Sequence, residues 1–318
     1  MGQKDYAQND YFNDKVRFVD ICNGILFQGK ECIKAEDIEE MNPDIVYQDK
    51  DQAKLRKTIP DKMCLWKGIY ISVLALENQS MVDYSMVFRT MKTEALSYEK
   101  QWMALEREKR NQGLIGKKEK LAWNIQAKEE RFVPVILIVI YYGMDKAWDG
   151  AKCLYDMLDM DKELEPYVTN YKMNLFDYHD YEDFSFFKTE NRELFEVLSC
   201  AKDEKKMDQL LSGNIERYRN LAADAVEVIF KLTGIDLNIL ENVRKDGMEV
   251  VDMCKAWDDH KEAGRNEGRQ EGRQEGRQEG VFTSIKNLME STKVSAIQAM
   301  EMLQVSETDR DIYLSMLR

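Results

Sequence analysis

The sequence predicts an α/β fold in which a mixed sheet is flanked by helices and is followed by a helical C-terminal half and tail. Two segments, 69–76 and 134–142, are almost entirely apolar, as expected of strands that are covered on both faces. A long segment with helical character separates them, and this strand–helix–strand order favours a mixed sheet with flanking helices. The segment 184–261 lacks proline and consists of short amphipathic stretches, which predicts helices.

The first predicted elements are a helix and a hairpin. Residues 15–27 place apolar side chains at near-helical spacing, and Gly24 and Gly29 mark the expected end of this helix. Two β-rich runs, 61–65 and 69–77, are separated by a three-residue link that ends in glycine. Such a link is typical of a hairpin, so the two runs are expected to pair with each other.

The remaining predicted elements are one more strand and several helices. A buried strand is expected over 134–143, where an apolar run ends at a glycine. Helices are expected over 84–110, 191–199, 206–211 and 215–232, and two or three short helices are expected after residue 281. This order divides the chain into a core (1–175), a helical domain (176–262), a repeat (263–280) and a small helical tail (281–318).

The repeat Glu-Gly-Arg-Gln distinguishes the third of these regions. Glycine destabilises a helix by roughly 1 kcal/mol per residue, whereas the Glu and Arg rows recur every four residues and are expected to pair along a helix. A glycine row also allows two helices to approach closely, which makes this tail a candidate route to a homodimer. The alternative is a solvated, partly helical spacer. The glycines of the row are Gly264, Gly268, Gly272, Gly276 and Gly280.

Composition excludes several classes of function. The 318 residues include 46 basic and 59 acidic side chains, and the net charge of −13 argues against coating nucleic acid or an anionic membrane by bulk charge. No apolar run reaches the length of a membrane helix. Six scattered cysteines are typical of reduced thiols in a cytoplasmic protein. With only two histidines, zinc enzymes and histidine general bases are poor candidates, so any catalysis is expected to depend on carboxylates.

Two carboxylates and an amide are the strongest candidate site. Because side chains on a strand alternate between faces, Glu77 and Gln79 project to the same side, and Asp61 lies beside them if the two runs pair antiparallel. Oxygen ligands of this kind suit Mg²⁺, which orients and deprotonates a water and neutralises charge on a phosphodiester. The alternative is structural, with Asp61 only capping a turn. Asp44 belongs to a second Pro-Asp pair and fits the hairpin less well.

The same residues resemble a known nuclease signature. Pro60-Asp61, followed after fifteen residues by Glu77-x-Gln79, resembles the PD-(D/E)xK motif, with glutamine in the lysine position. Other segments resemble the Rpn family of recombination-promoting nucleases, also called YhgA-like transposases, and the likeness covers about residues 14–310. These segments are 14–24, 77–80, 84–89, 140–143 and 148–150, together with the glycine-repeat tail.

The resemblance implies a restriction-endonuclease-like core and a metal-dependent DNA endonuclease linked to recombination or transposition of mobile DNA. It implies that Asp61 and Glu77 hold Mg²⁺ or Mn²⁺ and that Gln79 places the attacking water or the scissile phosphate. Asp20 is the candidate for a further acidic residue on the first helix, with Asp14 as the alternative. Glutamine cannot supply the positive charge of the usual lysine, so stabilisation of the negative charge on the phosphodiester depends more on the metal ion.

Local basic residues are the candidate DNA contacts in this acidic chain. Residues 54–67 carry five basic side chains, Lys57 and Lys62 among them, against one acidic side chain, and Arg89 lies on the helix after the motif strand. Such side chains contact phosphates without sequence preference. The alternative function is a catalytically silent module that keeps the nuclease fold and binds nucleic acid or protein. Strand joining in addition to cutting stays open.

Overall fold

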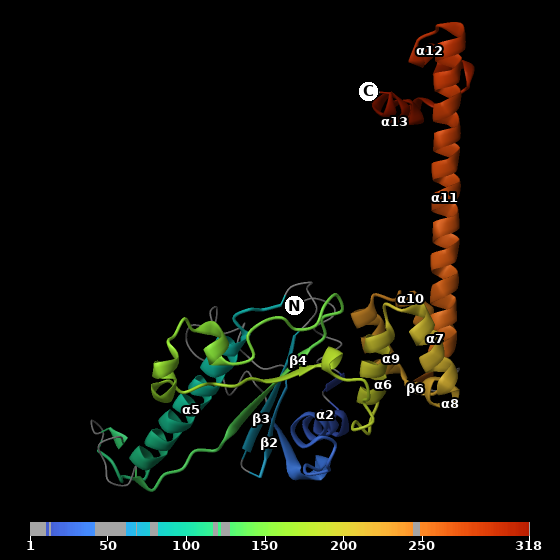
Figure 1. Cartoon of the computed structure of the whole chain (residues 1–318). Coiled ribbons are helices and arrows are strands. Elements are labelled where there is room, and N and C mark those ends of the chain that lie inside the picture. Colours follow the sequence, from blue (N-terminus) through green and yellow to red (C-terminus); the bar gives the residue numbers. More distant parts are fainter. Residues whose placement is uncertain are drawn as a thin grey trace. The chain divides into compact units, whose positions relative to one another are not determined.

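Residues 1–255 of the computed structural model contain a five-stranded mixed sheet (Figure 1). The structure describes residues 11–12, 14–41, 62–67, 69–76, 82–116, 120–121, 128–243 and 249–317. The strand order is β1-β2-β3-β4-β5, in which β1, β2 and β3 pair antiparallel and β4 and β5 run parallel to β3. The strands are β1 (Ile38–Met41), β2 (Lys62–Trp66), β3 (Ile69–Leu76), β4 (Val135–Tyr141) and β5 (Asn174–Asp177). The predicted mixed sheet is therefore confirmed.

Strand register brings several chain segments to one edge of the sheet. In the β2–β3 hairpin Lys62 lies opposite Val73, so β2 begins at the edge where β3 ends. Leu76 at the end of β3 lies beside Tyr141 of β4, and Tyr141 lies beside Asp177 of β5. We call this side of the sheet the carboxyl edge, because β3, β4 and β5 all finish there.

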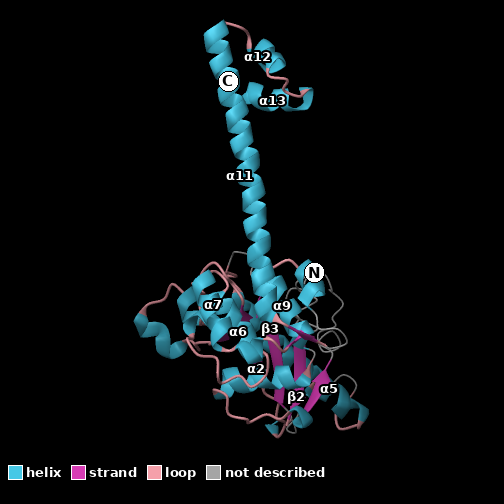
Figure 2. Ribbon diagram, turned by 90° about the vertical axis from the view of Figure 1, so that its right-hand side faces the viewer, coloured by secondary structure: helices cyan, strands magenta, loops and turns pink. Residues whose placement is uncertain are grey.

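Helices cover both faces of the sheet (Figure 2). On one face lies α5 (Met86–Asn111), where Met86 and Val87 pack with Val139 and Tyr141 of β4. On the other face, Tyr142, which follows β4, stacks on Phe195 of α6 (Asn191–Cys200) at a centroid distance of 5.9 Å. The alternation of β4 side chains between the two faces explains its almost wholly apolar sequence.

The first helix, α2 (Lys15–Phe27), matches its predicted bounds, but Gly24 does not mark its end. A Cβ atom at Gly24 would lie 2.3 Å from the ring of Phe187, so glycine is needed there for close packing. The helix ends instead at Gln28, whose φ of 55° is left-handed, and Gly29 follows with a φ of 80°. Of the two glycines, only Gly29 acts as the predicted stop.

The predicted helix over 215–232 is divided. The structure has α8 (Ile215–Tyr218) and α9 (Ala223–Thr233), and between them Leu221–Ala222 forms β6, which pairs with β7 (Val250–Val251). Because β6 pairs with a strand far along the chain, the spacing of apolar side chains within 215–232 does not reveal this pairing. The other helices of the region are α7 (Glu204–Gly213) and α10 (Asn238–Val243).

Residues 256–318 form a compact unit separate from residues 1–255. Most of this second unit is α11 (Met253–Thr292), which is helical through the whole repeat, and α12 (Ala296–Met302) and α13 (Glu307–Met316) follow it. Ile285, Ala299, Met300 and Tyr313 form its buried core. Among the described residues, no helix is both long enough and apolar enough to span a bilayer.

The spacing within the repeat does not bring the Arg and Glu rows of α11 onto a common face of the helix. Arg269 and Glu271 are only two positions apart, and residues two apart do not face each other on a helix. The neighbours at four positions carry the same charge, as Glu271 and Glu275 do. Such like-charge pairs, together with the glycines, make the repeat an intrinsically weak stretch of helix.

Candidate functional site at the carboxyl edge of the sheet

Five polar side chains gather at the carboxyl edge, and we call them the carboxyl-edge cluster. They are Tyr84, Lys146, Asp149, Asp177 and His179. Tyr84 immediately precedes α5, Lys146 and Asp149 lie in the loop after β4, and Asp177 ends β5. Three of the segments that carry the family resemblance, 84–89, 140–143 and 148–150, therefore meet at the edge where β3 ends.

An aspartate–histidine pair is the most buried part of this cluster. The Asp177 side chain is 1% exposed, and one of its oxygens lies 2.7 Å from Nδ1 of His179. Backbone N–H groups of Trp148 and His179 also donate to this carboxylate, at 2.6 and 3.1 Å. A carboxylate accepts hydrogen bonds only, so Nδ1 of His179 is the donor. Nε2 is then the ring nitrogen that is left for a further partner, and the side chain is 25% exposed.

The exposed part of the cluster is a charge-paired triad. Asp149 accepts hydrogen bonds from Lys146 Nζ at 2.6 Å and from the Tyr84 hydroxyl at 3.1 Å. The bond from Lys146 lowers the pKa of Asp149, and the same bond raises the pKa of Lys146. Both groups are therefore charged at neutral pH, and the triad joins the start of α5 to the loop after β4.

Tyr141 connects the two parts of the cluster. Its hydroxyl donates to the Lys146 carbonyl at 3.1 Å, and its ring lies 6.4 Å from the ring of His179. Burial raises the pKa of Tyr141, and the charge of Asp177 raises it further. A Cβ at Gly143 would lie 1.9 Å from the Tyr141 hydroxyl oxygen, so the glycine after Ile140-Tyr141-Tyr142 makes room for this side chain.

Most of the residues predicted for the metal site and for DNA contact lie outside the described residues. These are Lys57, Asp61, Glu77 and Gln79. Lys62 is the first residue of β2, at the carboxyl edge. Among the described residues, no group of three or more histidine, cysteine, aspartate or glutamate side chains is placed to hold a metal ion.

Arg89, a predicted DNA contact, lies in the first turns of α5 and is 26% exposed. Its guanidinium pairs with Asp83 at 2.5 Å, and Asp83 also accepts from the backbone and hydroxyl of Ser85. Burial opposes ionisation of Asp83, but the hydrogen bonds from Ser85 and Arg89 outweigh it and lower its pKa. Asp83 thus stabilises the start of α5 and fixes Arg89 near the carboxyl edge.

Asp20, the predicted acidic residue on the first helix, is buried in α2 and fully engaged. Oδ1 accepts from the backbone of Lys188 at 2.7 Å. Oδ2 accepts from the hydroxyl of Thr189 at 2.6 Å and from the amide of Asn191 at 2.9 Å. These bonds anchor the turn before α6 to α2, while a catalytic role for Asp20 stays a prediction. The alternative, Asp14, caps α2 by accepting from two backbone N–H groups.

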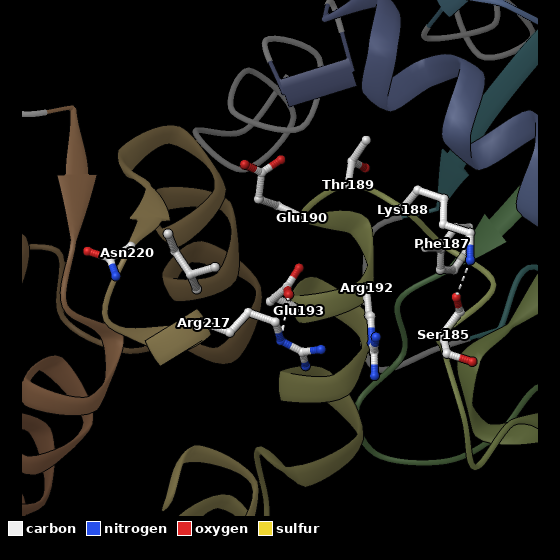
Figure 3. A pocket seen from close by; sticks show the side chains of 10 residues that line it. Ser185, Phe187, Lys188, Thr189, Glu190, Arg192, Glu193, Arg217 and Asn220 are labelled. Atoms are coloured by element: carbon white, nitrogen blue, oxygen red, sulfur yellow. Dashed lines mark hydrogen bonds and ion pairs between the residues drawn. The ribbon is translucent and has the colours of Figure 1, made fainter. Parts of the chain in front are cut away.

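A pocket of about 550 Å³ lies next to this turn (Figure 3). The arginines that line it form ion pairs with glutamates. Arg217 points at Glu193, with Nε 2.8 Å from the carboxylate, and Arg192 pairs with Glu196 at 2.8 Å. Burial raises the pKa of Glu193. The lining residues are Ser185, Phe187, Lys188, Thr189, Glu190, Arg192, Glu193, Arg217, Asn220 and Leu221. Since its arginines already have carboxylate partners, we take the carboxyl edge as the candidate functional site.

The aspartate–histidine pair was not predicted from the sequence. The presence of only two histidines made histidine bases poor candidates, although one well-placed histidine is sufficient for proton transfer. The available signal was the order Asp177-Tyr178-His179 directly after a short apolar segment. An aspartate two residues before a histidine at a strand end can bond the imidazole once the chain turns, as it does here in a 3-10 turn.

Comparison with known proteins finds one family that part of the chain resembles. No curated protein and no solved structure matches the chain. The sequence model of one family, described as "Putative transposase, YhgA-like", matches residues 62–217, from the start of β2 to α8. The matched region includes four strands of the sheet and the whole carboxyl-edge cluster. The family resemblance predicted from the sequence is therefore confirmed over residues 62–217, which match the model of the YhgA-like family.

Proposed function

We propose that this protein is a metal-dependent DNA endonuclease with a restriction-endonuclease-like core, and that it acts in recombination or transposition of mobile DNA. The observation that carries the proposal is the convergence at the carboxyl edge. The segments 84–89, 140–143 and 148–150, which carry the resemblance, surround the end of β3, directly before Glu77 and Gln79 in the chain. A transposition-related role is also the one that the matched family describes.

The proposed metal ligands are Asp61 and Glu77. Their described chain neighbours, Lys62 and Leu76, both lie at the carboxyl edge. Carboxylate oxygens are the ligands that Mg²⁺ and Mn²⁺ prefer, so the donor set fits a hard divalent cation. When bound, such an ion supplies positive charge beside the phosphodiester and makes the attacking water more acidic.

The proposed roles of the other residues follow from their chemistry. The Gln79 amide both donates and accepts hydrogen bonds, which suits it to orient a water or a phosphate oxygen. Lys57, Lys62 and Arg89 contact phosphates of the DNA backbone and set affinity without sequence preference. Asp20 keeps the first helix in place beside the turn that precedes α6.

Cleavage of supercoiled plasmid tests this proposal. Purified protein is incubated with Mg²⁺, Mn²⁺ or EDTA, beside Asp61→Asn and Glu77→Gln. We expect cation-dependent nicking or linearisation that falls about 1,000-fold in either variant, because several kcal/mol of charge stabilisation is lost and each 1.36 kcal/mol is worth tenfold in rate. Asp44→Asn removes the carboxylate of the other Pro-Asp pair and is the matched control that keeps cleavage.

Two results would contradict the proposal. Cleavage that survives both substitutions identifies a contaminant or a different site. A wild-type protein that cuts no DNA with either cation favours the silent binding module instead. Titration with Mn²⁺ then decides that alternative, since a silent module has no reason to bind the ion through Asp61 and Glu77.

A further inference from the structure

We propose that His179 is the general base of the reaction, positioned by Asp177, and that Nε2 accepts the proton of the attacking water. This inference rests on the proposed nuclease function and adds a catalytic residue that the PD-(D/E)xK signature does not contain. It is carried by the described geometry of the pair and by its place at the carboxyl edge.

The pair has the geometry that a histidine base requires. Asp177 lies 2.7 Å from Nδ1 and, as a carboxylate, fixes the proton of the neutral ring on that nitrogen. Nε2 therefore carries the free lone pair. The ring stacks on Tyr178 at a centroid distance of 4.1 Å, which restricts its rotation. Two backbone N–H groups hold the Asp177 carboxylate, so the orienting group is itself rigid.

The environment of the pair favours proton acceptance. A buried carboxylate beside the ring stabilises the imidazolium that forms when Nε2 is protonated. The rings of Tyr141 and Tyr178 lie beside the imidazole. Lys146 and Lys152 pair with Asp149 and Asp180. The side chain is 25% exposed, so a water at the edge can reach it.

Strand register places the pair at the edge where β3 ends. Asp177 and Leu76 flank Tyr141 on either side, so their backbones are two strand spacings apart, about 10 Å. Glu77 follows Leu76 directly in the sequence.

The signature itself leaves the role of base unfilled. A lysine at the last motif position could accept a proton, but this chain has Gln79 there, and an amide does not take up a proton at neutral pH. Asp61 and Glu77 are occupied as ligands in the proposed site. His179 lies at the same edge, and with Nδ1 bonded to Asp177 its Nε2 is the nitrogen left to accept a proton.

The step is balanced without any further reagent. Nε2 takes one proton from the water as the water oxygen bonds to phosphorus. The bond between phosphorus and the leaving oxygen breaks, and that oxygen receives a proton from solvent. The imidazolium then returns its proton to solvent, so that one water and one phosphodiester give one phosphomonoester and one alcohol.

Cleavage by His179→Ala and Asp177→Asn tests the assignment in the full chain. A missing general base costs about 100- to 10,000-fold in rate, so we expect kcat to fall by at least about 100-fold while KM for the DNA changes little. Added imidazole should restore part of the activity of His179→Ala, which a merely structural role would not allow. His260→Gln removes the only other histidine and is the matched control that keeps full activity.

A second readout does not depend on cleavage. With ¹⁵N-labelled histidine only two imidazole rings are observed, and His260→Gln assigns them. We expect the His179 ring in the tautomer protonated at Nδ1, and we expect its Nε2 signal to shift when duplex DNA and Ca²⁺ are added. Thermal unfolding of each variant shows whether it is folded.

The outcomes separate the two proposals. Undiminished cleavage by folded His179→Ala, or a His179 ring protonated at Nε2, overturns the base and leaves the nuclease standing. Loss of activity that imidazole does not restore also overturns the base. A wild-type protein that cleaves no DNA overturns the nuclease and the base together. Cleavage lost in His179→Ala, restored by imidazole and kept in His260→Gln supports both.

Discussion

Asp20 shows how a residue that resembles a catalytic group also has a structural task. Its carboxylate accepts four hydrogen bonds from Lys188, Thr189 and Asn191, which lie about 170 residues away in the chain. Neither spacing nor helix phase in the sequence reveals such partners. Local sequence therefore predicts where Asp20 lies, on an amphipathic helix, but not what it bonds.

We expect Asp20→Ala to lower the free energy of unfolding by about 3 kcal/mol, because several donors of the buried turn lose a charged acceptor. Asp14→Ala, which removes only the cap of the same helix, should cost about 1 kcal/mol. Urea denaturation followed by circular dichroism measures both values. If Asp20→Ala unfolds like the wild type but cleaves no DNA, Asp20 belongs to the catalytic site and its hydrogen bonds stabilise little.

At the scale of single elements, the sequence predicts those helices and strands that the local pattern of apolar side chains determines. The strands at 69–76 and 134–142 are long apolar runs, and α2 and α5 have clear helical spacing, so all four were predictable. The strands β1 and β5 are four residues each and exist because a neighbouring strand pairs with them. The division between α8 and α9 has the same cause, since β6 pairs with a strand about 30 residues later.

The repeat of α11 makes a prediction about association. No atom lies within 4 Å of a Cβ built at any glycine of the row, so the structure leaves that face open. If two copies pack there, alanine at Gly268, Gly272 and Gly276 should weaken the dimer, although each alanine stabilises an isolated helix by about 1 kcal/mol. The matched control replaces Gln270, Gln274 and Gln278 with alanine.

Analytical ultracentrifugation measures this effect directly. We expect the full chain to sediment as a dimer, and the glycine variant to dissociate at a concentration where the glutamine variant stays dimeric. If the full chain and a chain that ends at His260 both sediment as monomers, the tail does not form a dimer.

At the scale of the whole molecule, two compact units predict two unfolding events. The unit 256–318 has a small core of Ile285, Ala299, Met300 and Tyr313, and a unit of this size is only marginally stable. Calorimetry should show its transition below that of residues 1–255. Tyr313→Ala should lower only the first midpoint, because removing a large buried ring costs about 3 kcal/mol. A single transition that shifts as a whole would contradict independent units.

The proposed catalytic region illustrates the same limit at this scale. Linear motifs predict the carboxylates and the family, whereas the aspartate–histidine pair becomes visible only when β5 is placed beside β4. His179 is 103 residues after Leu76 in the sequence, and strand register alone brings the ends of β3 and β5 to one edge. Contacts between strands that are far apart in the sequence cannot be inferred from the local pattern of a single sequence.

The four-residue period of α11 also determines how the length of this helix can change in evolution. Gain or loss of one Gly-Arg-Gln-Glu unit changes the helix length by about 6 Å and leaves the net charge unchanged, because each unit contains one arginine and one glutamate. The side chains of 262–277 are exposed, so neither buried core is altered. The length of this helix is therefore a trait that can change in whole repeats at little cost to folding.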